Sequence, residues 1–119
     1  SLTLDLDGIT SVKGKNYKFA LKVKKSGIYR VTVTASSEQS ELAQIPVTLF
    51  VMGTAAAVFT WNGTGGASVS FDKDIPIFSR FSAVRLYFAQ SGLDMKSISF
   101  ELVRQADSVE ALAFVQNEE

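Results

Sequence analysis

The chain has 119 residues, of which 46% are hydrophobic and 20% are charged, and its formal net charge at pH 7 is zero. A chain of this length fits one domain, and this composition argues against an intrinsically disordered chain. The sequence contains no histidine and no cysteine, which excludes disulfides, thiolate chemistry, and the commonest general base and zinc ligand.

Apolar and polar residues alternate along the first third of the chain, with the period of two that is typical of strands half buried in a sheet. The alternating segments are, in chain order, residues 2–6, 17–24 and 29–35. A short link that contains Gly27 joins the second segment to the third. We therefore expect these two segments to pair as a hairpin.

The middle and the end of the chain predict further strands and the turns between them. Residues 45–52 are almost continuously apolar, as in a strand with both faces covered, and Pro46 is tolerated near its start. Asn62-Gly63 is the strongest turn signal, and Asp72-Lys73-Asp74 is predicted to be another turn. Further strands are predicted at residues 57–61, 69–71, 75–77, 84–88 and 98–102. About seven or eight short strands with no intervening helix indicate an all-β sandwich of two antiparallel sheets.

Residues 107–115 fit either of two structures. Asp107 could cap a short helix, with Glu110 three residues later, or the same segment could form a last strand, which the all-β remainder favours. We interpret residues 1–119 as a single domain excised from a larger protein, with any targeting segment upstream, because the start is already strand-like. No apolar run approaches the roughly 20 residues of a membrane span, so no membrane partner is expected.

The sequence carries no signature of an enzyme. The loop Gly63-Thr64-Gly65-Gly66 lies between predicted strands and lacks the lysine that cradles a phosphate. Asp72, Asp74 and Asp94 could supply the paired carboxylates of a glycosidase, but all three fall in predicted turns, where Asp is common because it caps the backbone. We therefore expect a non-catalytic domain, and no nucleic-acid partner.

Aromatic residues carry the case for binding a sugar, because sugar rings stack on flat side chains while their hydroxyls need amide or carboxylate partners. Trp61 is the only tryptophan, and it ends a predicted strand just before Asn62, whose amide both donates and accepts. Trp61 could equally plug one end of the core, since it shares a phase with Phe59. Tyr17 opens its strand and could present a ring at a rim, or could pack in the core beside Phe19.

Cations gather in one stretch of the sequence with no acid among them. They are Lys13, Lys15, Lys18, Lys22, Lys24, Lys25 and Arg30. This stretch could attract an anionic polymer. The alternative, which we favour, is that Lys18, Lys22 and Lys24 occupy the polar phase of one strand, where lysines keep an exposed or edge strand soluble.

Calcium is the metal that this composition allows, because oxygen ligands suffice for it. The carboxylates that could contribute are Asp5, Asp7, Asp72, Asp74 and Asp107. None of them shows the spacing of a dedicated calcium loop, so a structural Ca²⁺ ion stands as an alternative to the absence of any cofactor.

Three short motifs follow one another in the part of the chain from Gly27 to Leu102. They are Ser26-Gly27-Ile28-Tyr29-Arg30-Val31, then Val51-Met52-Gly53 with Thr64-Gly65-Gly66, and then Gly92-Leu93-Asp94-Met95-Lys96-Ser97-Ile98-Ser99-Phe100. In these motifs the chain resembles the carbohydrate-binding modules of families 6 and 35. Those modules are jelly-roll, galactose-binding-domain-like β-sandwiches appended to glycoside hydrolases.

The resemblance implies a sugar site built from one ring of an early strand, a Trp after the Thr-Gly-Gly loop, and the Asn of the closing motif. By position these fall on Tyr17, Ala67 and Asp94. Ala67 lacks the ring that closes the aromatic clamp, and Trp61 could substitute for it from the other side of the same loop. The glutamate-bearing first strand of the family has no clear match, which weakens the calcium site that the resemblance implies.

The function that the resemblance implies is non-catalytic. A secreted carbohydrate-binding module would target an appended glycoside hydrolase to an oligosaccharide or polysaccharide, with Trp61 and Tyr17 stacking on the sugar and with Asn62 and Asp94 binding its hydroxyls. The alternative is a structural or interaction sandwich that packs against a neighbouring catalytic domain and has lost sugar binding.

Overall fold

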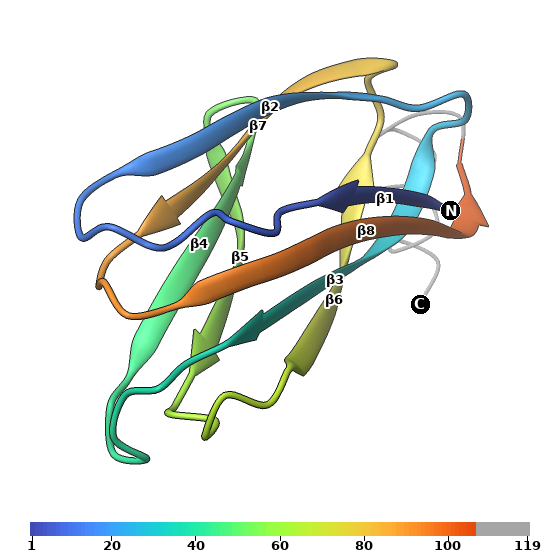
Figure 1. Ribbon diagram of the computed structural model, residues 1–119. Helices are drawn as coiled ribbons and strands as arrows, with labels where there is room; N and C mark the ends of the chain where they lie inside the picture. Colours follow the sequence, from blue (N-terminus) through green and yellow to red (C-terminus); the bar gives the residue numbers. More distant parts are fainter. Residues whose placement is uncertain (107–119) are drawn as a thin grey trace, which may run out of the picture.

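The structure is a computed structural model that describes residues 1–106, and these residues form strands and no helix (Figure 1). The strands are β1 (Leu2–Asp5), β2 (Asn16–Lys22), β3 (Gly27–Ser36), β4 (Ile45–Val51), β5 (Thr54–Trp61), β6 (Val69–Ile77), β7 (Phe81–Phe88) and β8 (Asp94–Gln105). Within this range no helix is long and apolar enough to cross a membrane. The segment 107–115, for which helix and strand were alternatives, lies outside the described residues.

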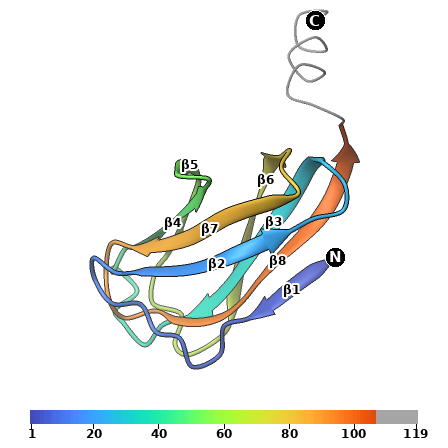
Figure 2. The ribbon, with the colours of Figure 1, turned by 90° about the horizontal axis from the view of Figure 1, so that it is seen from above.

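The strands form two four-stranded antiparallel sheets that pack face to face (Figures 1 and 2). Sheet A has the strand order β1-β8-β3-β6, and sheet B has the order β2-β7-β4-β5. The predicted all-β sandwich of two antiparallel sheets is therefore confirmed.

The core lies between the two sheets and follows from the alternation in the sequence. Because successive side chains of a strand point to opposite faces, every second residue enters the space between the sheets. Val31 and Val33 of sheet A face inward in this way, as do Val47, Leu49 and Leu86 of sheet B, and all five are fully buried. Each such side chain contributes about 1.5–3 kcal/mol to stability through burial.

The hairpin expected between residues 17–24 and 29–35 does not exist. β2 pairs with β7 in sheet B, whereas β3 pairs with β8 and β6 in sheet A. The link between them crosses from one sheet to the other. Gly27 is required there because a Cβ would overlap the carbonyl oxygen of Arg104 on β8.

Two further expectations from the sequence were wrong. Only the inner face of β4 is covered, because Pro46, Thr48 and Phe50 lie half-exposed on the outer face of sheet B. The continuous apolar run reflects the position of β4 between β7 and β5, not a second covering layer. Residues 72–74 form part of the edge strand β6 instead of a turn, and charged residues are common on edge strands because they prevent further pairing.

Four loops meet at one end of the sandwich, which we call the loop end, toward the lower left of Figure 1. They are residues 6–15, 37–44, 62–68 and 89–93. Among residues 1–106, the links at the opposite end are the short turns 23–26, 52–53 and 78–80. The predicted site residues all lie in or beside the loop end.

Candidate functional site

A buried serine joins three loops at the loop end. Ser37 is fully buried, and its Oγ donates to the carbonyl oxygen of Gly92 at 2.7 Å. Its backbone N–H donates to Thr64 Oγ1 at 2.9 Å, and the Thr64 N–H donates to the Ser37 carbonyl oxygen at 2.9 Å. Buried polar groups that are satisfied in this way hold their backbone in place.

A second buried serine ties the first loop to the last. Ser11 Oγ accepts a hydrogen bond from the Leu93 N–H at 2.9 Å, and the Ser11 N–H donates to the Leu93 carbonyl oxygen at 2.8 Å. Nearby, the Lys13 N–H donates to Ser91 Oγ at 2.9 Å. The loop end is thus one hydrogen-bonded surface.

Trp61 lies beneath this surface and not on it. The side chain is fully buried, its Nε1–H donates to the Val69 carbonyl oxygen at 3.0 Å, and the ring of Phe71 packs edge-on against it at a centroid distance of 5.2 Å. Trp61 is on the inward phase of β5, and Phe71 of β6 covers the open side between the two sheets. The structure contradicts the stacking role predicted for Trp61 and shows the alternative, in which it plugs the end of the core.

The other three predicted residues lie apart. Tyr17 is half-buried on the inward phase of β2, 6.2 Å from the ring of Phe19. Asn62 is exposed, and its Nδ2 donates to the Ala43 carbonyl oxygen at 2.7 Å. Tyr17 and Asn62 mark opposite edges of sheet B, because β7 and β4 separate β2 from β5. Asp94 is exposed at the first residue of β8 in sheet A. The structure brings these residues to one end of the molecule but not into one cluster.

The outer face of sheet B gathers aromatic and polar side chains more closely. We call this surface the sheet B face. Its central residues are Asn16, Lys18, Thr48, Phe50, Arg85 and Tyr87. The strand register places them in two neighbouring rows, because residues directly opposite each other in an antiparallel pair point to the same side. Lys18, Arg85 and Phe50 form one row, and the other row consists of Asn16, Tyr87 and Thr48.

Arg85 is held in a fixed orientation on this face. Its guanidinium carbon lies 3.7 Å from the centroid of the Phe50 ring, and its Nη1 donates to Asn16 Oδ1 at 2.8 Å. Stacking on an aromatic ring is a favoured arrangement for a guanidinium group. A guanidinium has five N–H donors in a rigid fork, so the group can bind a further acceptor without reorienting.

Tyr87 and a shallow hollow complete the sheet B face. Tyr87 is half-buried in the row between Asn16 and Thr48. The hollow of about 410 Å³ lies at Ala20 and Ala83, which are direct partners across β2 and β7. Small side chains leave space there, beside the aromatic and cationic residues. The sequence signal for this site was the position of Tyr87 on the face of its strand opposite to the apolar residues. This signal did not show which residues of other strands lie beside Tyr87.

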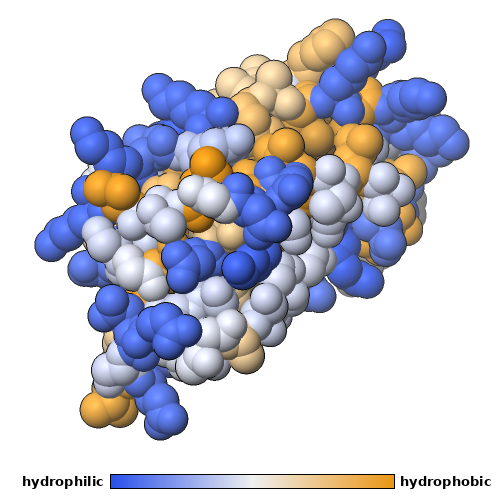
Figure 3. Space-filling model, in the orientation of Figure 1, coloured by the Kyte–Doolittle hydropathy of each residue, from blue (hydrophilic) through white to orange (hydrophobic). Residues whose placement is uncertain are grey.

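A second hollow lies on the open side of the sandwich between β1 and β2. It has a volume of about 470 Å³, and its lining includes Leu2, Val23, Tyr29, Phe100 and Leu102. Burial raises the pKa of the Tyr29 phenol. Apolar residues gather on the upper right of Figure 3, with hydrophilic residues around them. Lys22, Lys24 and Lys25 also line this groove, which therefore combines apolar side chains with cations but lacks the amide and guanidinium groups of the sheet B face.

The carboxylates proposed for calcium do not converge. Asp5 and Asp7 lie at the β1 edge of sheet A, and Asp72 and Asp74 lie on β6 at the opposite edge. Asp74 is instead bound to Arg30 of β3, with Nε to Oδ1 at 3.0 Å. Among residues 1–106 no group of three or more Asp, Glu, His or Cys side chains is placed to hold a metal ion. The described carboxylates therefore do not gather around one point, and Asp107 lies outside the described residues.

Comparison with known proteins first defines the class of fold. Sandwiches of the same architecture occur in carbohydrate-binding modules of families 6, 35 and 36. The C-terminal family 6 module of LamC, a marine laminarinase from Zobellia galactanivorans, matches 84% of this chain and 98% of its own with a TM-score of 0.71 and 11% identity. A family 36 module in complex with calcium and xylotriose matches 85% of this chain and 89% of its own with a TM-score of 0.68 and 13% identity. The fold that the sequence resemblance implied is confirmed.

Two β-glucosidases are similar to the chain in sequence. A β-glucosidase of Ruminococcus albus is 49% identical over 108 residues, which are 90% of this chain and 11% of that enzyme. The structure of a β-glucosidase from Paenibacillus barengoltzii matches 70% of this chain and 9% of its own, with 25% identity and a TM-score of 0.64. The chain thus spans only about a tenth of the length of these relatives. No family model matches it.

Proposed function

We propose that this domain is a non-catalytic carbohydrate-binding module of a secreted glycoside hydrolase, and that it binds an oligosaccharide or polysaccharide on the sheet B face. The observation that carries this proposal is the set of flat and polar side chains around Tyr87, with Asn16 and Arg85 already oriented by their mutual hydrogen bond. The fold of carbohydrate-binding modules supports it.

The chemistry of the site follows from these groups. The ring of Tyr87 offers a flat apolar surface to the C–H face of a pyranose, while its hydroxyl remains available at the edge. The Asn16 amide donates as well as accepts, and Arg85 donates only. An oligosaccharide that lies along β7 would contact the Tyr87 ring with one sugar unit and the Arg85 guanidinium with the next sugar unit.

Attachment to a catalytic domain is the second part of the proposal. It is supported by the similarity to a β-glucosidase of which this chain covers 11%. A module tethered to an enzyme raises the effective concentration of the enzyme on a polysaccharide, so each site needs only modest affinity.

The test compares two half-buried tyrosines on different surfaces. Cello-, xylo- and laminari-oligosaccharides, each with its acidic or sulfated counterpart, are titrated into the domain by calorimetry. We expect Tyr87→Ala to weaken binding about tenfold or more, because stacking on an aromatic ring is lost. Tyr17→Ala at the loop end should leave affinity unchanged.

The outcome distinguishes the candidate surfaces. If Tyr17→Ala, Asn62→Ala or Asp94→Ala removes binding while Tyr87→Ala does not, the site is the loop end predicted from the sequence and the sheet B face is the wrong surface. Circular dichroism of each variant serves to check that the fold is retained.

A second candidate function is packing against a neighbouring domain, and one observation favours it. Met52 and Phe81 are 59% and 63% exposed at the end of sheet B opposite to the loop end. If no sugar binds and the substitution of both residues by Ser releases the domain from its neighbour in the full-length protein, this alternative replaces sugar binding.

A further inference from the structure

The acidic residues of the described chain are unevenly divided between the two sheets. β2, β4, β5 and β7, which make up sheet B, contain no Asp or Glu. The cations of these strands are Lys18, Lys22 and Arg85, and the turns at the far end add Lys24, Lys25 and Arg80. The acids in the connections to sheet B are Asp7, Glu38 and Glu41, and they lie in loops of the loop end.

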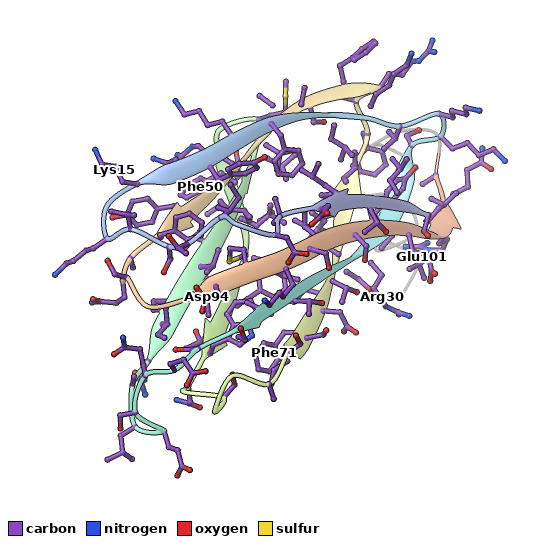
Figure 4. The ribbon with its side chains drawn as sticks, in the orientation of Figure 1. Lys15, Arg30, Phe50, Phe71, Asp94 and Glu101 are labelled. Atoms are coloured by element: carbon purple, nitrogen blue, oxygen red, sulfur yellow. The ribbon has the colours of Figure 1, made fainter. Side chains whose placement is uncertain are left out.

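The outer face of sheet A has the opposite character. Its acids are Asp5, Asp72, Asp74 and Glu101, which the strand register places on the same side as Arg30. Arg30 and Glu101 are direct partners across β3 and β8 and lie together in Figure 4. The hydrogen bond from Arg30 to Asp74, and then the negative charge of that carboxylate, raise the pKa of Arg30.

Arg85 has a different set of partners. The salt bridge found among residues 1–106 joins Arg30 to Asp74. Arg85 instead donates a hydrogen bond to the neutral side-chain oxygen of Asn16. The Phe50 ring, labelled in Figure 4, fixes the plane of the guanidinium group. Lys18 is the direct partner of Arg85 on β2, so two cations stand side by side. Since no carboxylate of these strands neutralises them, an anionic ligand would complete the site.

The spacing suits a sugar that carries a carboxylate. Arg85 and Tyr87 are two residues apart on one strand and point to the same side, which separates their Cα atoms by about 7 Å. When one sugar unit stacks on Tyr87, the C6 carboxylate of the next unit could reach the guanidinium of Arg85, whose fork of two parallel N–H donors matches the geometry of a carboxylate.

We infer that the sheet B face selects an acidic glycan, that is, a polysaccharide whose sugars carry uronate carboxylates, with Arg85 and Lys18 as the residues that determine this specificity. The inference rests on the proposed function and goes further by naming the class of ligand. The neighbouring Tyr87 supplies the stacking surface that any sugar needs, and the two cations supply the discrimination.

The experiment uses acidic probes with neutral partners of the same skeleton. Tetragalacturonate is compared with its methyl ester, and a glucuronate-substituted xylo-oligosaccharide is compared with its unsubstituted parent, in calorimetric titrations at low and high salt. We expect each acid to bind about tenfold or more tightly than its neutral partner, and the difference to shrink as salt is added.

Two Arg→Gln variants at different positions provide the control, because each of them removes one positive charge. Arg85→Gln should abolish the preference for the acid, whereas Arg30→Gln, on the other sheet, should retain it. Polyglutamate tests for attraction by charge alone, and we expect it to bind far more weakly than the acidic sugars because it has no ring to stack on Tyr87.

Each contrary result has a separate meaning. Equal binding of acid and ester, or loss of the preference in Arg30→Gln, overturns the acidic specificity while sugar binding stands. Polyglutamate that binds as tightly as the uronates also overturns it, because the face would then recognise any polyanion, including an acidic protein. If neither acidic nor neutral sugars bind, the acidic specificity and the proposed function both fail.

Discussion

On sheet A the outward-facing arginine meets a carboxylate, whereas on sheet B it meets an aromatic ring and an amide. Arg30 and Asp74 satisfy each other, and their charges cancel. Arg85 is oriented by Phe50 and Asn16, and neither of them cancels its charge. The comparison teaches that one fold can hold two identical side chains in place by different means. Only the second arrangement leaves a charge available to a ligand.

The largest expected effect comes from the core that both faces share. Trp61→Ala should lower the free energy of unfolding by about 3–5 kcal/mol, because a large buried side chain is removed and a cavity is left. Urea unfolding followed by far-UV circular dichroism measures this loss, with Trp61→Phe as a milder control.

The result also decides the role of Trp61. The buried indole should fluoresce at short wavelength and should not respond to sugars. A Trp61→Ala variant that is as stable as the original protein but no longer binds sugar would restore the stacking role predicted from the sequence.

A smaller effect sharpens the contrast between the two arginines. Phe50→Ala removes the ring beneath Arg85, so the guanidinium loses its fixed plane, and affinity for an acidic oligosaccharide should fall about three- to tenfold. Val58→Ala, an apolar truncation on the neighbouring strand of the same face, should have no such effect. If both variants bind alike, the stack does not organise the site.

The smallest effect is expected on sheet A. Asp74→Asn breaks the ion pair with Arg30, whose side chains are 45% and 42% exposed. The melting temperature and the affinity for sugar should both stay unchanged, because exposed ion pairs contribute little to stability. A clear gain of acidic-glycan binding in this variant would show that an unpaired arginine on either sheet suffices, and would remove the distinction between the faces.

Much of the fold could be predicted from local patterns in the sequence. Alternation identified the inward residues of β2, β3, β7 and β8, because the period of a strand depends only on its own residues. It could not assign partners, and the expected hairpin of β2 with β3 was wrong for that reason. Which strands share a sheet depends on contacts between distant residues.

The candidate site was harder to predict for the same reason. Trp61 ends its strand beside a turn, as a rim residue would, but its burial depends on Phe71 of another strand. Asn16, Arg85 and Phe50 come from three strands that are far apart in the sequence. Their proximity, and the lack of Asp and Glu in the four strands that surround them, becomes visible only once the strand order of sheet B is known.

The two buried serines of the loop end also limit how its loops can change. Ser37 holds Gly92 and Thr64, and Ser11 holds Leu93, so four loops share one set of hydrogen bonds. An insertion in one loop would leave a buried donor or acceptor of another without its partner. Evolution or engineering that diversifies this end would therefore have to alter several loops together, whereas the sheet B face can change one side chain at a time.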